Sequence, residues 1–202
     1  MNPLKASKIS REDHMQFDHL EIVRIAIEAG VSIMDIYESS GQIEVQSKDD
    51  DSPLTKADIA AHKIIIRGLA TIDPEVPVVS EEGRVGDPKQ SELAWLVDPL
   101  DGTKEFIKRN GMFTVNIALM KRMNASWKPI FGVVHAPVNR TTWYGGVDVP
   151  ATKITDAETS EISVRKQTNA QTRLVASGSH RAELDEKFAK ELGEHELVRM
   201  GS

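Results

Sequence analysis

The stretch WLVDPLDGTKEF, residues Trp95–Phe106, decides the fold because it joins a buried strand to a turn that carries two carboxylates. The apolar run ends at Asp98, and the proline after it keeps Asp98 extended, outside the α region. Asp101 follows on the turn, and Gly102 allows the backbone to approach a ligand closely. Both carboxylates can therefore converge beyond the strand end, with the carbonyl group of Leu100 available between them.

Two converging carboxylates repel each other, and a divalent cation between them would remove that repulsion. Carboxylate and carbonyl oxygens are hard ligands that suit Mg²⁺. The backbone N–H groups of Gly102 and Thr103 are predicted to open a helical turn, whose end favours phosphate. Asp98 and Asp101 could instead be ordinary turn residues, since Asp-Pro and Asp-Gly are common in turns.

Other acids and one histidine occupy similar positions. Glu81 and Glu82 follow the short apolar strand VPVVS, and taken alone they indicate a solvated acidic loop. This strand and the one that ends at Asp98 are close in sequence, as neighbouring parallel or antiparallel strands would be, so the acids at the two strand ends could share a metal. Asp58 stands in a Thr-x-x-Asp capping pattern and is either a site carboxylate or a first-turn acid that stabilises the helix dipole. The loop ASGSH presents Ser179 and His180 to an anion, or is a plain exposed loop.

The remaining pattern indicates an α+β protein, because helices precede a run of sequential strands. Helices are expected over 17–37, 55–72 and 182–193, and a polar link over 148–170. Strands are expected over 42–48, 76–80, 92–98, 113–122, 129–138, 141–147 and 173–180, and 195–202 begins a strand with no partner after it. Three regions follow from this reading: a flexible arm (1–16), a metal-binding α+β domain (17–165) and the start of an incomplete α/β domain (166–202).

The amino-acid composition excludes several classes of function. The 202 residues carry a net charge of −6, which argues against binding to nucleic acid polymers but leaves room for a small anion at a metal-charged site. The absence of cysteine excludes disulfides, thiolate zinc sites and cysteine nucleophiles. No segment has the length of a transmembrane helix or the apolar core of a signal peptide, so the expected location is the cytoplasm. Nothing in the sequence indicates the oligomeric state.

With SEE, WLVDPLDGTKEF and NGMFTVNIAL together, the sequence closely resembles the inositol monophosphatase-like phosphatases, which are metal-dependent and lithium-sensitive. The segments SPLTKADIAAH, IFGVVHAPV and LGEHELV resemble the 3'(2'),5'-bisphosphate nucleotidase branch more than the inositol or fructose phosphatases. The resemblance implies a layered αβαβα sugar-phosphatase fold and Mg²⁺-dependent removal of the 3'-phosphate from adenosine 3',5'-bisphosphate, giving AMP. It leaves action on the sulfated analogue open.

The resemblance also assigns roles to residues of this chain. It implies two or three Mg²⁺ ions held by the ligands Glu81, Asp98, the Leu100 carbonyl and Asp101. Thr103 matches the residue that helps to position the attacking water, and Asp58 matches the acid that orients Thr103 or that water. Gly102 and Thr103 would donate backbone hydrogen bonds to the scissile phosphate. His180 and Ser202 match positions near the other phosphate of the nucleotide.

The sequence departs from the family at two places. Relatives carry a late Trp-Asp-x-Ala motif whose aspartate completes the metal site, and this sequence stops before any such motif. Gly178 stands where relatives of this branch often have arginine. The expected fold is therefore truncated in its second domain, with apolar surface exposed. An inositol or sugar-phosphate monophosphatase, a metal- and nucleotide-binding form without turnover, and a fragment without a ligand remain as alternatives.

Overall fold

The computed structural model describes residues 18–39, 45–47, 53–124, 126–164, 172–177 and 183–200. The helices are α1 (His19–Glu38), α2 (Lys56–Ile72), α3 (Thr103–Ile107) and α4 (Glu183–Glu191), with a 3-10 turn at Pro88–Gln90. The strands are β1 (Val45–Ser47), β2 (Pro53–Thr55), β3 (Val78–Ser80), β4 (Gly83–Val85), β5 (Leu93–Asp101), β6 (Thr114–Met123), β7 (Ser126–Ala136), β8 (Thr141–Gly146), β9 (Val149–Ile154), β10 (Thr159–Glu161), β11 (Thr172–Ser177) and β12 (His195–Met200). The predicted flexible arm lies outside the described residues.

Helices α1 and α2 form because each has a capped start and one apolar face. The Asp18 side chain accepts a hydrogen bond from the backbone N–H of Leu20 at 3.0 Å and caps α1. The buried positions of α1 and α2 recur every three or four residues, so each helix presents one stripe to the core. The two helices pack closely, because a Cβ added to Gly68 would lie 2.7 Å from the Cγ1 atom of Ile25.

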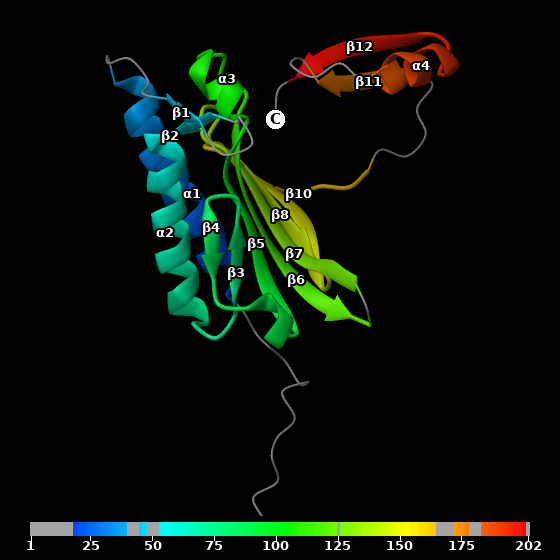
Figure 1. Cartoon of the computed structure of the whole chain (residues 1–202). Coiled ribbons are helices and arrows are strands. Elements are labelled where there is room, and N and C mark those ends of the chain that lie inside the picture. Colours follow the sequence, from blue (N-terminus) through cyan, green and yellow to red (C-terminus); the bar gives the residue numbers. More distant parts are fainter. Residues whose placement is uncertain are drawn as a thin grey trace, which may run out of the picture.

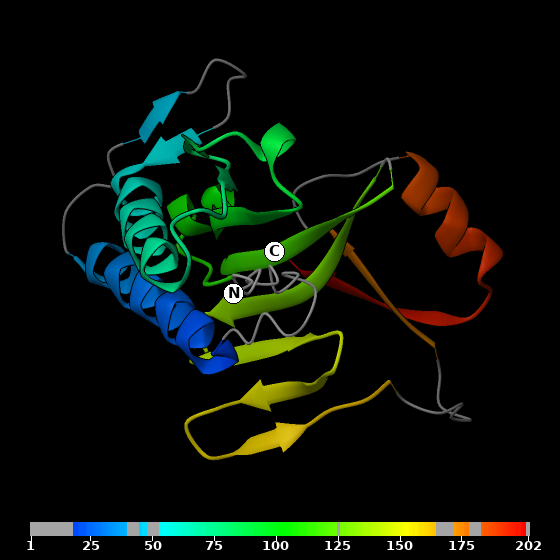
Figure 2. The ribbon, with the colours of Figure 1, turned by 90° about the horizontal axis from the view of Figure 1, so that it is seen from below.

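The largest sheet has the strand order β10-β9-β8-β7-β6-β5-β3-β4. Its neighbouring strands are antiparallel except β3 and β5, which are parallel. Both long helices lie side by side against the same face of this sheet (Figures 1 and 2). That face contributes the fully buried side chains of Trp95, Ile117 and Val133, which pack into the core with the helices.

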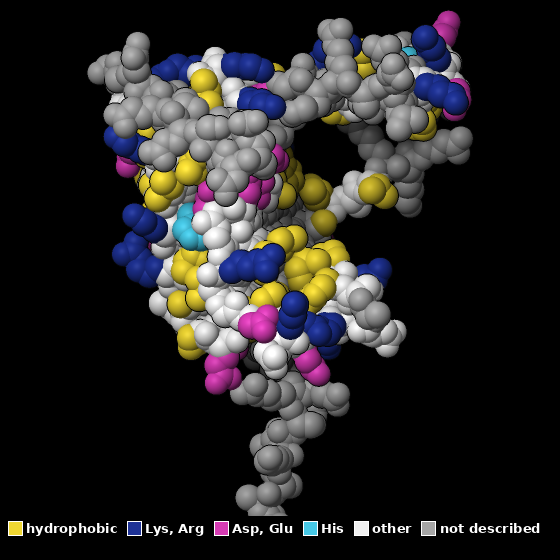
Figure 3. Space-filling model, viewed as in Figure 1, with side chains coloured by type: hydrophobic (Ala, Val, Ile, Leu, Met, Phe, Trp, Pro, Cys, Tyr) yellow, Lys and Arg dark blue, Asp and Glu magenta, His cyan; other side chains and the backbone are white. Residues whose placement is uncertain are grey.

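The opposite face of the large sheet is partly apolar and exposed. Leu96 on β5 and Val134 on β7 are 49% and 40% exposed, although both stand inside strands. Hydrophobic side chains gather on this side of the sheet in the space-filling view (Figure 3). The expectation of exposed apolar surface is therefore confirmed. Among the described helices, none is both long and apolar enough to span a bilayer.

The order of helices and strands follows the sequence expectation, apart from the short strands β2 and β4, which were not predicted, and two corrections. Residues 148–170 were predicted to be a link, but β9 and β10 pair with each other and extend the sheet beside β8. These two strands at one end of the sheet are mostly exposed, so their pairing depends on backbone hydrogen bonds that leave no apolar pattern in the sequence. Strand β12 was predicted to lack a partner, but the chain crosses over through α4 and pairs β12 parallel to β11. The division into domains remains a prediction.

A buried histidine connects the sheet to α1. His135 on β7 is buried, and its Nδ1 atom lies 2.9 Å from the Oγ1 atom of Thr142. The edge of its ring lies against Gly30 of α1, where an added Cβ would be 2.5 Å from the Cδ2 atom of His135. Gly30 is therefore required by close packing within the helix.

Burial lowers the pKa of His135 from 6.5 to about 4, although a backbone hydrogen bond at Thr141 opposes the shift. Between these two pH values the unfolded chain binds a proton at His135 that the folded chain does not bind. The free energy of unfolding therefore has its full value above pH 6.5 and falls as the pH approaches 4. Over this range we expect wild type to lose about 3 kcal/mol of unfolding free energy more than His135→Asn, which stays neutral. Urea unfolding at several pH values checks this, and parallel curves for the two proteins would contradict it.

Candidate active site

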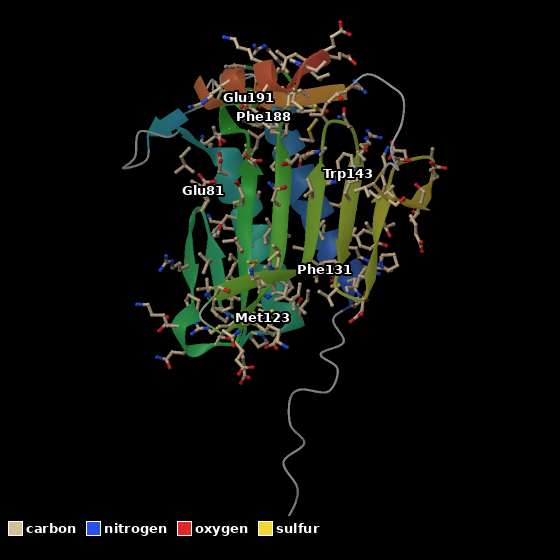
Figure 4. All side chains as sticks on the ribbon, turned by 90° about the vertical axis from the view of Figure 1, so that its right-hand side faces the viewer. Glu81, Met123, Phe131, Trp143, Phe188 and Glu191 are labelled. Atoms are coloured by element: carbon tan, nitrogen blue, oxygen red, sulfur yellow. The ribbon has the colours of Figure 1, made fainter. Side chains whose placement is uncertain are left out.

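Two carboxylates meet at one edge of the sheet because β3 and β5 run in the same direction. In this parallel pair Ser80 lies beside Val97, so the next residues along the two strands are Glu81 and Asp98. The N–H of Glu81 donates a hydrogen bond to the carbonyl oxygen of Val97 at 3.0 Å, which extends the pairing past the end of β3. Glu81 stands at the turn that joins β3 to β4 (Figure 4). The sequence prediction that these strand ends are neighbours is confirmed.

A β-bulge turns the second aspartate to the same side. Asp98 pairs with Asn116 and Asp101 pairs with Thr114, so three steps along β5 match two steps along β6. In a regular strand, residues three apart face opposite sides of the sheet. The one extra residue in β5 turns Asp101 back to the side that Asp98 faces. The Nδ2 group of Asn116 accordingly donates to the Oδ2 atom of Asp101 at 3.4 Å. Asp98, Asp101 and Asn116 therefore share one face.

The electrostatics of this edge suit a cation. Burial, the neighbouring charges of Glu81 and Asp101, and a hydrogen bond to Glu81 together raise the pKa of Asp98 to about 7. The Oδ1 atom of Asp98 and the Oδ1 atom of Asn116 are buried without a hydrogen-bond partner among the described residues. A buried acceptor without a donor is costly unless a ligand satisfies it. The donor set of carboxylate oxygens fits a hard divalent ion.

The acids do not form a finished metal cage. Within the described ranges, no three acidic or histidine side chains are close enough to one another to hold a metal ion as they stand. Glu81 and Asp101 are nevertheless close enough to Asp98 for their charges to raise its pKa. In the space-filling view, acidic side chains gather at this end of the molecule, above the β3–β4 hairpin (Figure 3).

Asp58 connects the start of α2 to the site. Its Oδ2 atom accepts hydrogen bonds from the N–H group (2.8 Å) and the hydroxyl group (2.5 Å) of Thr55, completing the predicted capping box. Its Oδ1 atom lies 3.2 Å from the hydroxyl of Thr103, which is also 3.2 Å from the carbonyl oxygen of Leu100. Asp58 is 1% exposed, and burial raises its pKa although these hydrogen bonds oppose the shift. Both interpretations of Asp58 from the sequence are therefore compatible, because one carboxylate caps the helix and contacts Thr103.

The predicted helical turn after Asp101 is confirmed as α3, which follows Gly102 in a left-handed conformation (φ 94°). Its buried Phe106 packs against Tyr37 and Phe113, with ring centroids 5.3 Å away in both cases. At the far end of the turn, the Arg109 guanidinium stacks over the Tyr37 ring and donates to the carbonyl oxygens of Tyr37 and Ser39. These contacts fix the turn that carries Thr103 against the end of α1.

The structure therefore brings Asp58, Glu81, Asp98, Asp101 and Thr103 to one region. Glu82 contributes a backbone contact, since its N–H donates to the Ser80 hydroxyl at 3.3 Å. The predicted positions Gly178, Ser179, His180 and Ser202 lie outside the described residues.

Sequence reasoning missed two polar residues beside the acids. These are Asn116, which bonds to Asp101, and His62, whose Nδ1 atom is 2.9 Å from the Ser80 hydroxyl. The spacing of Asp58 and His62, one helical turn apart, could have indicated the second.

The chain is similar in sequence to known proteins. The sequence profile of the inositol monophosphatase family matches residues 16–200. The chain belongs to this family. Among curated relatives, the 3'(2'),5'-bisphosphate nucleotidase CysQ of Escherichia coli strain K12 is 46% identical over 189 residues, and CysQ of Salmonella typhimurium is 42% identical over 192. Each alignment covers 90% of this chain and 72% of the relative.

Solved structures agree with this assignment. The crystal structure of CysQ from Bacteroides thetaiotaomicron matches with a TM-score of 0.73 and 33% identity, covering 91% of this chain and 72% of that one. The extragenic suppressor protein suhB of Bartonella henselae matches with a TM-score of 0.71 and 25% identity. The mixed α/β phosphatase fold and the family expected from the sequence are confirmed.

Proposed function

We propose that this chain is a magnesium-dependent 3'(2'),5'-bisphosphate nucleotidase, which removes the 3'-phosphate of adenosine 3',5'-bisphosphate and gives AMP. The observation that carries the proposal is the 46% identity to a nucleotidase of that name, over a span that includes every acid of the site. The net charge of −6 disfavours nucleic acid polymers, and a metal-charged site can still bind a small anionic nucleotide. Action on the sulfated analogue is part of the same proposal.

The residues proposed to hold Mg²⁺ are Glu81, Asp98, the carbonyl of Leu100 and Asp101. Members of the family generally depend on magnesium, and we propose two or three ions at this site. The buried Oδ1 atom of Asp98 without a partner supports a ligand there. Bound Mg²⁺ would lower the pKa of a coordinated water and would place positive charge beside the phosphate oxygens.

The chain's own groups orient the nucleophile. The Thr103 hydroxyl can donate its proton to Asp58 Oδ1 and accept a hydrogen bond from the attacking water. The raised pKa of Asp58 favours this direction, because a carboxylate with a higher pKa accepts a proton more readily. The water oxygen then forms a bond to phosphorus as the bond to the 3'-oxygen breaks. The water gives up one proton toward the Thr103 hydroxyl and Asp58, and the 3'-oxygen takes up one proton as it leaves as a hydroxyl group. Water itself is the nucleophile, so no covalent enzyme intermediate is required.

The nucleotide is proposed to lie with its scissile phosphate at the backbone N–H groups of Gly102 and Thr103. The carbonyl oxygen of Gly102 accepts the N–H of Phe106 at 2.9 Å, so α3 holds this part of the backbone in place. His180 and Ser202 remain proposed contacts for the other phosphate.

Turnover of adenosine 3',5'-bisphosphate and of inositol 1-phosphate, measured side by side with Mg²⁺, tests the substrate. We expect a kcat/KM for the nucleotide at least about tenfold above that for inositol 1-phosphate, because the sequence is closer to the nucleotidases. A preference for inositol 1-phosphate would contradict the proposal and favour a sugar-phosphate monophosphatase. Calorimetry in parallel separates a third case, since heat of nucleotide binding without phosphate release would indicate a binding protein.

A further inference from the structure

We propose that His62 is a positioning residue, which acts through Ser80 to hold the backbone turn that carries Glu81. The inference rests on the proposed function, because it concerns Glu81 as a ligand of magnesium. It gives a role in the site to a residue to which the resemblance assigned none.

The first step is the contact between α2 and the end of β3. His62 lies on α2 one turn after Asp58, so the two side chains point from the same face of the helix. The Nδ1 atom of His62 lies 2.9 Å from the Oγ atom of Ser80, a distance typical of a direct hydrogen bond. Ser80 is buried, so water competes little for its hydroxyl group.

The second step is the contact between Ser80 and the turn. The Oγ atom of Ser80 accepts the N–H of Glu82 at 3.3 Å, while the N–H of Glu81 donates to the carbonyl oxygen of Val97 at 3.0 Å. The peptide groups at both glutamates are thus held, one by β5 and one by the Ser80 hydroxyl. The backbone on each side of Glu81 sets the direction of its side chain toward Asp98.

The direction of the hydrogen bonds makes the His62 contact specific. A hydroxyl group has one proton, so Ser80 can accept from Glu82 and donate to His62 if the imidazole ring is neutral. Burial lowers the pKa of His62, and the adjacent Lys63 lowers it further, which keeps the ring neutral at pH 7. The path then runs from the Glu82 N–H through the Ser80 hydroxyl to the Nδ1 atom of His62.

The consequence is that α2 aligns both sides of the acid site. Asp58 contacts Thr103 on one side, and His62 contacts the Glu81 turn through Ser80 on the other. A helix is a rigid spacer, so the two groups keep a fixed separation. Groups that orient metal ligands typically change metal affinity by about 10- to 100-fold when removed.

The test is a Mg²⁺ titration of the melting temperature of the full 202-residue chain, without substrate. For His62→Ala we expect the Mg²⁺ concentration that gives half of the maximal shift to rise about tenfold. His62→Asn should restore it to near the wild-type value, because its side-chain amide can take the place of Nδ1. Ser80→Ala should match His62→Ala, and the double variant should be no worse than either single one, since all three break the same path.

The matched control is Thr142→Val, which breaks the other histidine–hydroxyl bond of the same length, 2.9 Å. It should lower the melting temperature without moving the Mg²⁺ dependence. If His62→Ala shows the wild-type Mg²⁺ dependence, or if Thr142→Val shifts it equally, the positioning role is wrong while the metal site stands. If wild type itself shows no Mg²⁺-linked shift, the proposed metal site is wrong and the inference is overturned with it.

Discussion

Asp98→Asn lowers phosphate release by about 10³-fold or more, and the metal-free variant melts at a higher temperature than wild type at pH 8. The loss follows from the proposed metal site, because a bound metal contributes several kcal/mol to transition-state stabilisation and each 1.36 kcal/mol is tenfold in rate. The gain in stability has a separate cause. Burial, with the charges of Glu81 and Asp101, raises the pKa of Asp98 to about 7, so the folded metal-free protein holds an unfavourable charge at pH 8.

Two measurements separate these causes. Phosphate release at saturating Mg²⁺ reports the first, and melting with and without Mg²⁺ reports the second, where each kcal/mol moves the midpoint by about 2–4 °C. Mg²⁺ should stabilise wild type but have little effect on Asp98→Asn. Asp87→Asn is the matched control, because Asp87 only caps the turn at Pro88–Gln90 and asparagine can accept the same hydrogen bond. A variant of Asp98 that unfolds would show that its role is structural.

Thr103→Val lowers kcat by about 10²-fold or more while the nucleotide and Mg²⁺ still bind. Valine has nearly the same shape as threonine, but it lacks the hydroxyl that lies 3.2 Å from both the Oδ1 atom of Asp58 and the carbonyl of Leu100. Positioned proton transfer typically contributes about 10²- to 10⁴-fold to a rate, so the loss should appear in kcat. The backbone N–H at position 103 is kept, which is why binding should survive.

Thr103→Ser is the control for this prediction, because serine keeps the hydroxyl group and should keep most of the activity. Single-turnover phosphate release, with calorimetry of nucleotide binding, distinguishes a slower chemical step from weaker binding. A Thr103→Val enzyme with the wild-type kcat would show that the hydroxyl does not orient the water. A large rise in the dissociation constant with unchanged kcat would place Thr103 in binding alone.

The sequence revealed the acids but not the way in which the strands bring them together. The apolar runs before Glu81 and Asp98 are local, and a strand that ends on a carboxylate can be read directly. That β3 and β5 pair in parallel, within a sheet that is otherwise antiparallel, depends on the whole chain and has no local signal. The extra residue of β5 was hidden for the same reason, because a bulge is defined only by the partner strand.

Two further differences have local causes. The short strands β9 and β10 were missed because half-exposed strands at the end of a sheet need no alternating apolar pattern. His62 was overlooked because a histidine on a helix gains meaning only from the residue it contacts, here Ser80 on β3. In contrast, the capping box at Thr55 and Asp58 was readable, because its hydrogen bonds are made within four residues.

The unequal step count of β5 and β6 fixes the number of residues between the two aspartates. A chain with one residue more between Asp98 and Asp101 could keep every strand neighbour and the bulge, and still aim the second carboxylate into the helical core. The fold tolerates such a change in length far better than the chemistry does. A change of one residue in a loop outside the sheet leaves the direction of both carboxylates unchanged, whereas the interval DPLD cannot gain one residue while both carboxylates serve one cation.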